Sequence, residues 1–135
     1  MATVIAFDYG KRRVGVAIGD LRLRIAHPLE TIDCNNQRRF EEKLKDLLNE
    51  WSPSKLIVGM PIDPEGGEHS LSTCVRQFGL KVSTIFQSPV VFVNENYTSV
   101  EAESFLNSIG LRGISQKKYL DSVAATTILK DFFEN

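Results

Sequence analysis

The sequence has 135 residues, of which 42% belong to the hydrophobic class and 24% are charged. These values are ordinary for a globular domain and exclude a disordered tail, a collagen-like repeat and a coiled-coil rod. The formal net charge is −1, from 16 Lys and Arg against 17 Asp and Glu, so binding to an anionic partner would have to rest on a local basic cluster. The length predicts one domain over residues 1–135, large enough to bury a core without a disulfide or a metal staple.

The two cysteines and the absence of long apolar runs indicate the cellular setting. Cys34 and Cys74 are far apart and form no CxxC or Cys/His spacing, so neither a structural zinc site nor a disulfide framework is suggested. The N-terminus lacks the features of a signal peptide, and no apolar run approaches the ~20 residues of a membrane span. We therefore expect a soluble, cytoplasmic protein with no membrane partner.

The first third of the chain predicts three strands. An apolar run over residues 4–7 stops at Asp8, a turn follows, and a second apolar run covers residues 14–19. This pattern is typical of an antiparallel hairpin. A third strand is expected over residues 26–32, at an edge of the sheet because it contains Pro28.

The remainder of the chain alternates between helical and strand patterns. Apolar residues at helical spacing predict four helices, over residues 36–51, 70–86, 98–109 and 119–133. Thr98 and Glu101 form a capping box at the start of the third, and a polar, basic linker is expected before the fourth. Continuous apolar runs over residues 55–59 and 90–93 predict buried strands.

This order of elements predicts an α/β fold. Strands separated by helices pair in parallel through right-handed crossovers, so we expect a mixed five-stranded sheet that begins with an antiparallel hairpin meander and carries helices on both faces. Binding sites in such sheets form beyond the carboxyl ends of the parallel strands. The positions just after Phe7, Val58 and Val93 are therefore the first to consider.

Acidic residues follow two of these strand ends. Asp8 follows the first strand, Glu95 follows the last, and Asp121 lies in the first turn of the final helix. Convergent carboxylates repel one another unless a cation lies between them, and oxygen ligands of this kind select Mg²⁺ or Mn²⁺. Each acid also has a structural explanation when taken singly: Asp8 as a turn residue, Glu95 as a solvated loop residue and Asp121 as a partner of the helix dipole.

Four segments of the sequence form a set of motifs. They are residues 8–20 (Asp-Tyr-Gly-Lys-Arg-Arg-Val-Gly-Val-Ala-Ile-Gly-Asp), 56–61 (Leu-Ile-Val-Gly-Met-Pro) with Gly66 following, 94–102 (Asn-Glu-Asn-Tyr-Thr-Ser-Val-Glu-Ala) and 121–129 (Asp-Ser-Val-Ala-Ala-Thr-Thr-Ile-Leu) preceded by Lys117 and Lys118. Together they span nearly the whole chain, and in this order they resemble the motifs of the YqgF/RuvX family.

The resemblance implies an RNase H-like fold and a metal-dependent nuclease. The family is assigned to trimming the 5′ end of precursor 16S rRNA in ribosome biogenesis, and it has also been described as Holliday junction resolvase-like. Carried over by position, Asp8, Glu95 and Asp121 form the catalytic and metal-binding triad. Two ions, Mg²⁺ or Mn²⁺, would activate water and stabilise the leaving oxygen of a phosphodiester.

Three positions depart from the family pattern. Asn94 and Asn96 replace an Asp and an Arg, which removes one charge and one bidentate phosphate contact. Gly19 replaces a small hydroxyl residue. The triad survives, so we expect an active enzyme whose hold on its substrate is altered.

Two basic clusters adjoin the predicted acids. Lys11, Arg12 and Arg13 lie in the first hairpin, and Lys117 and Lys118 precede the last helix. Arg22 and Arg24 belong to the first cluster in sequence. We expect Lys11, Arg12, Arg13, Lys117 and Lys118 to contact the phosphates of a nucleic acid, although solvated charged loops have the same composition.

Three other functions remain open. A Holliday junction resolvase would use the same chemistry on four-way DNA and would need a dimer, whereas we expect a monomer or a weak homodimer. A nucleotide-binding module of the actin and sugar-kinase type also begins with such a hairpin, but it closes two domains around ATP. A non-catalytic RNA-binding or ribosome-assembly factor would bind RNA without metal.

Overall fold

The computed structural model describes residues 2–61, 70–95 and 114–134, without the side chains of residues 95 and 114–121. Its elements are β1 (Thr3–Tyr9), β2 (Arg13–Asp20), β3 (Ile25–Asp33), α1 (Gln37–Trp51), β4 (Lys55–Pro61), α2 (Ser72–Phe86), β5 (Val90–Glu95) and α4 (Ile114–Glu134). The predicted helix over residues 98–109, with its capping box, lies outside the described residues.

The strands form one mixed five-stranded sheet in the order β3-β2-β1-β4-β5. β1 pairs antiparallel with β2, as does β2 with β3, whereas β4 is parallel to both β1 and β5. The predicted meander, the parallel pairing and the edge position of the Pro28 strand are therefore confirmed. Since Pro28 lacks an N–H group, an edge position beside the irregular register at Val16 and Ala17 accommodates it.

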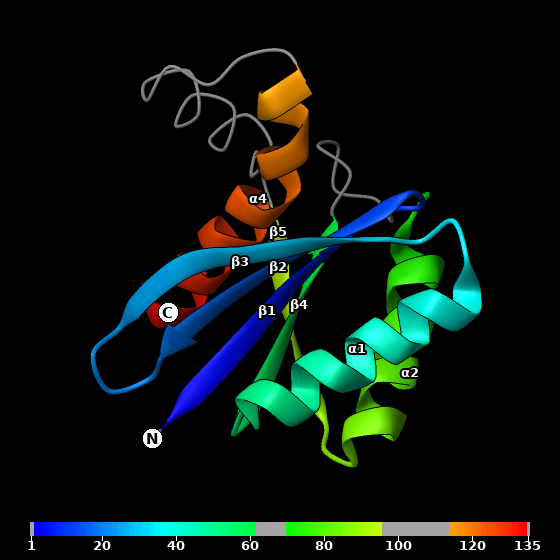
Figure 1. Ribbon diagram of the computed structural model, residues 1–135. Coiled ribbons are helices and arrows are strands. Elements are labelled where there is room, and N and C mark those ends of the chain that lie inside the picture. The colour runs from blue at the N-terminus through cyan, green and yellow to red at the C-terminus, as the bar shows by residue number, and fades with distance from the viewer. Residues whose placement is uncertain (1, 62–69, 96–113, 135) are drawn as a thin grey trace.

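Helices cover both faces of the sheet, as expected: α1 and α2 lie on one side and α4 on the other (Figure 1). Side chains of β1 alternate between the two layers. Ile5 and Phe7 pack with Phe40 of α1 and Phe78 of α2, whereas Val4 and Ala6 pack in a second cluster with residues of α4. A sheet buried on both faces explains the continuous apolar runs of β1 and β4.

Local signals account for the bounds of α1. The Asn36 side chain accepts a hydrogen bond of 3.1 Å from the Arg39 N–H group, which caps the first turn. At the other end, Ser52 adopts a left-handed conformation with φ of 42° and donates its N–H to the Leu48 carbonyl. Pro53 follows and cannot continue the helix.

The prediction for the start of the last helix was wrong. α4 begins at Ile114, five residues before the expected Tyr119, so most of the predicted basic linker is helical. Gln and Lys are good helix formers, so a polar segment without apolar periodicity can still be helical. β1, β4 and β5 also extend two residues beyond their predicted ends, to Tyr9, Pro61 and Glu95, so Asp8 lies inside β1 and not in the turn that was predicted to follow residue 7. Among the described helices, none has the length and apolar character of a membrane span.

Gly19 is required by the packing of α4 against the end of β2. A Cβ atom at this position would overlap the carbonyl oxygen of Ile25 and lie 2.9 Å from Cδ2 of Leu129. The backbone oxygen cannot rotate away, so the small hydroxyl residue of the family pattern has no room here. The departure at Gly19 thus has a steric cause in this chain.

We expect Gly19→Ser to lower the free energy of unfolding by about 1–3 kcal/mol, the usual cost of overpacking, measured by urea denaturation. Gly79→Ala is the matched control. Its Cβ would meet the ring of Phe92 at 2.5 Å, but that ring is 42% exposed and can move. The helical position of Gly79 also favours Ala by about 1 kcal/mol. Equal losses in the two variants would contradict this steric explanation.

Candidate nuclease site

Asp8 lies near the carboxyl end of β1, between two glycines. It pairs with Gly15 of β2, and the Phe7–Val58 pair that precedes it places Gly59 at the same level on β4. Asp8 is half-buried and both glycines are buried. Because neither neighbouring strand carries a side chain at this level, the surroundings of Asp8 suit a ligand that approaches the backbone closely.

The strand alternation assigns Asp8 to the face that α4 covers. Val4 and Ala6 belong to the cluster on that face, together with Ala125 of α4. Phe7 belongs to the opposite cluster, and successive side chains of a strand point to opposite faces. Asp8 is therefore directed to the α4 side of the sheet.

β5 ends at Glu95, on the same side of the sheet as Asp8, where the parallel strands have their carboxyl ends. The Glu95 backbone pairs with Pro61, and Val93 pairs with Gly59, so Glu95 lies two strands away from Asp8 and two residues further along. With strands about 4.8 Å apart and a rise of about 3.3 Å per residue, the two Cα atoms are about 12 Å apart. The topology thus brings both predicted residues to one edge, while the Glu95 side chain lies outside the described part.

Asp121 belongs to the second turn of α4. It precedes Ala125 by four residues, and Ala125 is fully buried against the sheet. Residues four apart lie on the same side of a helix. The backbone of position 121 is therefore on the sheet-facing side of α4, although its side chain also lies outside the described part.

Asn94, one of the departures from the family pattern, lies on the other side of β5 from Val93. Its side chain is exposed, and Val93 packs in the α4-side cluster. The missing charge at position 94 is therefore not on the face to which Asp8 is directed. Asn96 lies outside the described residues.

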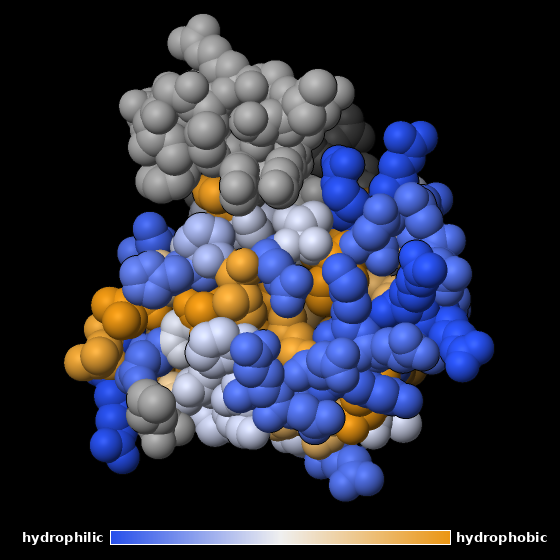
Figure 2. Space-filling view, in the orientation of Figure 1, coloured by the Kyte–Doolittle hydropathy of each residue, from blue (hydrophilic) through white to orange (hydrophobic). Residues whose placement is uncertain are grey.

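The tip of the β1–β2 hairpin carries the first predicted basic cluster. Lys11, Arg12 and Arg13 are exposed, on a side of the molecule whose surface is largely hydrophilic around α1 (Figure 2). Backbone hydrogen bonds of 2.9 Å hold the tip, from the Gly10 N–H to the Arg13 carbonyl and from the Cys34 N–H to the Arg12 carbonyl. The cluster is thus presented on a braced turn within three to five residues of Asp8.

Lys117 and Lys118, the second predicted cluster, lie in the first turns of α4. Their side chains are outside the described part. The backbone places them one turn before Asp121, in the N-terminal part of α4.

Asp20, Arg22 and Arg24 lie at the opposite end of β2 from the hairpin tip and Asp8. Asp20 pairs with Thr3, at the start of β1, and its carboxylate accepts N–H bonds from Arg22 at 2.8 Å and Leu23 at 3.0 Å. The bonds from Leu23 and Arg22 lower the pKa of Asp20. Asp20 therefore shapes the turn, and the sequence-based grouping of Arg22 and Arg24 with the hairpin-tip cluster was wrong because β2 separates them.

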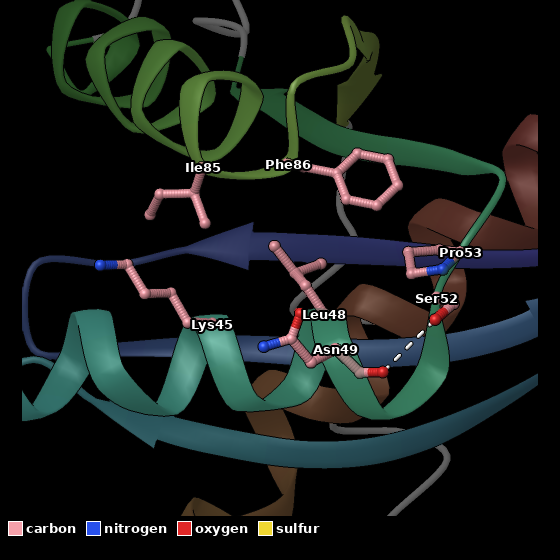
Figure 3. A pocket seen from close by; sticks show the side chains of 7 residues that line it. All are labelled: Lys45, Leu48, Asn49, Ser52, Pro53, Ile85 and Phe86. Carbon is pink, nitrogen blue, oxygen red and sulfur yellow. Dashed lines mark hydrogen bonds between the residues drawn. The ribbon is translucent and has the colours of Figure 1, made fainter.

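A pocket of about 470 Å³ between α1 and α2 also lies away from the site (Figure 3). It is lined at the carboxyl ends of both helices by residues that include Ser52, Pro53 and Phe86, and Ser52 donates a 3.3 Å hydrogen bond to the Asn49 carbonyl. The adjoining Ser54 N–H binds the carbonyl of Thr3, at the start of β1. This pocket is consequently at the opposite edge of the sheet from Asp8.

The donor chemistry of the site can be compared with a metal centre only in part. In residues 2–61, 70–95 and 114–134, no group of three or more His, Cys, Asp or Glu side chains gathers, but two of the predicted ligands are side chains beyond that description. The three predicted donors are all carboxylates, which suits Mg²⁺ or Mn²⁺, and the strands on both sides of Asp8 carry a glycine at its level.

The sequence pattern does not identify Gly15 and Gly59 as the residues that flank Asp8. It places both only within strands and family motifs. A signal was available, since glycine within an otherwise β-branched run often marks the close approach of a ligand. The levels of the two glycines relative to Asp8 depend on strand register, which the sequence pattern did not specify.

Comparisons with known proteins agree on one family. The family model described as "RuvX: Holliday junction resolvase" matches residues 2–135. A protein of Chromobacterium violaceum named "Putative pre-16S rRNA nuclease" is 46% identical over 131 residues, covering 96% of each chain. A protein of the same name from Nitrosomonas europaea is 43% identical over 132 residues, covering 98% of this chain and 89% of the relative.

Two solved resolvases resemble this fold. The fold resembles T. thermophilus RuvC in complex with Holliday junction substrate, with a TM-score of 0.57, 14% identity and coverage of 98% of this chain and 94% of that one. It also resembles the Fowlpox virus resolvase in a Holliday junction DNA complex, with a TM-score of 0.58, 14% identity and coverage of 98% and 97%. These likenesses confirm the predicted RNase H-like fold.

Proposed function

This chain belongs to the RuvX family, a nuclease family, and on that premise we propose that it is a divalent-metal-dependent nuclease that processes the 5′ end of precursor 16S rRNA. Residues 1–135 would act as one domain. The names of relatives at 43% and 46% identity favour rRNA over four-way DNA. The observation that carries the chemistry is the position of Asp8 between Gly15 and Gly59, at the edge where β5 ends in Glu95.

Asp8, Glu95 and Asp121 would be the catalytic residues and would hold the metal. Alternation along β5 groups position 95 with Val93 on the α4 face, and the helical repeat groups position 121 with Ala125. The distance of about 12 Å between the backbones of Asp8 and Glu95 exceeds a direct carboxylate contact. Asp8, Glu95 and Asp121 would therefore hold Mg²⁺ or Mn²⁺ between them rather than contact one another directly.

When bound, Mg²⁺ or Mn²⁺ would supply Lewis-acid activation of water and charge stabilisation at the leaving oxygen. The chain's own residues provide the setting for this chemistry. The carboxylates neutralise the ions, Gly15 and Gly59 let a phosphodiester approach the sheet edge, and the buried apolar cluster under α4 keeps that edge in a fixed geometry. A fixed geometry matters because small displacements of reacting groups are costly in rate.

The basic residues would hold the substrate beside these acids. Lys11, Arg12 and Arg13 are exposed on the braced hairpin tip, and Lys117 and Lys118 lie one turn before Asp121. Contacts of this kind bind phosphates without reading sequence and make affinity dependent on salt. They explain how a chain with a formal net charge of −1 could bind nucleic acid.

The direct test incubates the purified protein with 5′-extended 16S precursor RNA and with a four-way DNA junction, each with Mn²⁺, with Mg²⁺ or with EDTA. We expect metal-dependent cleavage of the RNA extension and slower cleavage of the junction. Junction cleavage alone would support the resolvase alternative, which the description of the family favours. RNA binding in EDTA with no cleavage under any condition would instead identify a non-catalytic assembly factor.

A further inference from the structure

A second pocket, of about 280 Å³, lies beside the hairpin tip on the face that carries α1 and α2. Its lining comes from Tyr9 and Lys11 of the hairpin, the first turn of α1, residues 74–81 of α2, and Cys34. Tyr9 follows Asp8 directly, so the two residues lie on opposite faces of the same strand end. The pocket therefore lies on the opposite face of the sheet from the proposed catalytic acids, near the same end of β1.

The aromatic residues of the pocket pack against one another. The Tyr9 and Phe78 rings have centroids 5.1 Å apart, and the Phe40 ring lies 6.2 Å from Phe78. Phe78 and Phe40 are almost completely buried, whereas Tyr9 is partly exposed. Tyr9 thus packs against a buried ring and keeps part of its own surface exposed.

The polar part of the pocket suits an anion with hydrogen-bonding edges. The described lining residues include Lys11 and Lys81 but no acid. Lys81 already forms a 3.0 Å ion pair with Glu41, which leaves Lys11, exposed on the tip, to meet a phosphate. The Gln37 and Gln77 amides also line the pocket, and each can both donate and accept hydrogen bonds.

We propose that this pocket receives one unpaired nucleotide of the strand that enters the nuclease site, with its base stacked on Tyr9 and its phosphate near Lys11. The inference rests on the proposed function, and it adds a binding position for a single-stranded extension. Unpaired bases commonly stack on aromatic side chains and are read along their edges by polar groups. The position of Tyr9 immediately after Asp8 would let one strand pass over the hairpin tip from the acids to the pocket.

Cys34 and Cys74 also line the pocket, and the chain contains no other cysteine. They can therefore report on occupancy without any measurement of cleavage.

The experiment measures the rate of maleimide labelling at Cys34 and Cys74 of the full chain in EDTA. The probes are adenosine 5′-monophosphate, ribose 5-phosphate and inorganic phosphate. We expect the nucleotide to slow the labelling of both thiols at far lower concentration than the two probes without a base. Equal protection by ribose 5-phosphate would overturn the stacking role of Tyr9 and leave only a phosphate site.

Variants test the residues that would make the contacts. Tyr9→Leu should weaken protection by the nucleotide about 5- to 150-fold, the value of one stacked base, whereas Tyr9→Phe should retain it. Gln77→Ala alters an exposed side chain outside the core and should weaken protection about 2- to 12-fold, as expected for one hydrogen bond. If urea denaturation shows that Tyr9→Leu is poorly folded, the Gln77→Ala variant still tests the proposal. Gln87→Ala, which lies outside the pocket, should match the wild type.

The outcomes for this pocket and for the nuclease are separable. Cleavage of the RNA extension with no thiol protection, or with protection unaffected in both Tyr9→Leu and Gln77→Ala, would overturn the pocket alone. Thiol protection that depends on Tyr9 in a protein that cleaves neither substrate would overturn the proposed nuclease function alone.

Discussion

Asp8→Asn is expected to fold like the wild type and to lose cleavage by about a thousandfold, because a lost metal ligand removes several kcal/mol of transition-state stabilisation. The substitution keeps the shape of the side chain and one oxygen but removes the charge that neutralises the ions. On the neighbouring strands only Gly15 and Gly59 lie at its level, so no side chain of β2 or β4 at that level is affected. Cleavage rates in Mn²⁺ and urea midpoints in EDTA, measured on the same preparations, give the two quantities.

Asp20→Asn is the matched control for this prediction. It changes the same residue type in the same hairpin, but Asp20 lies at the opposite end of β2 and its oxygen accepts bonds from the Arg22 and Leu23 N–H groups. We expect cleavage at the wild-type rate in this variant. Retained cleavage in Asp8→Asn, with contaminating nuclease excluded, would remove the basis for the proposed site.

Phe78→Ala is expected to lower the free energy of unfolding by about 3–5 kcal/mol, the usual cost of deleting a buried Phe side chain. Phe78 contacts three other rings, with centroid distances of 5.5 Å to Phe7, 5.1 Å to Tyr9 and 6.2 Å to Phe40. These contacts join α2 to both β1 and α1. Since small domains have total stabilities of about 5–15 kcal/mol, the variant should unfold at much lower urea concentration.

Leu80→Ala provides the control on the same helix. Leu80 is 69% exposed, so its truncation should change the free energy of unfolding by less than about 0.5 kcal/mol. Phe78→Leu, which preserves part of the volume, should fall between the two. Similar urea midpoints for Phe78→Ala and Leu80→Ala would mean that the ring cluster does not hold α2 on the sheet.

Much of the architecture could be predicted because hydrophobic pattern and topology rules act locally. The apolar run at residues 4–7 predicted β1, although the strand continues through Asp8 to Tyr9, and the helical spacing of Phe40, Leu44 and Leu48 predicted α1. The start of α4 could not be read in the same way. Residues 114–118 lack apolar periodicity, and their helical state depends on continuity with the buried turns that follow.

The candidate site was only partly accessible from the sequence. The rule that sites form beyond the carboxyl ends of parallel strands led to Asp8 and Glu95, and the structure places both backbones at one edge of the sheet. Their roles stay predictions, as does that of Asp121. The rule could not say which side chains flank Asp8, because that depends on how three strands are aligned.

The sequence by itself determined the elements, the order of acids and bases along the chain and the family, since each is written in residue types and their spacing. Only the tertiary structure decided which of these residues are neighbours. Antiparallel pairing of β1 with β2 sends Asp20 and Arg22 to the far edge from Asp8, although all lie within one motif. Parallel pairing through β4 brings Glu95 to the edge of Asp8 across 87 positions in sequence. Strand direction and register are set by long-range hydrogen bonds and packing. They therefore separate residues that belong to one sequence motif, and they bring together residues that are far apart in the chain.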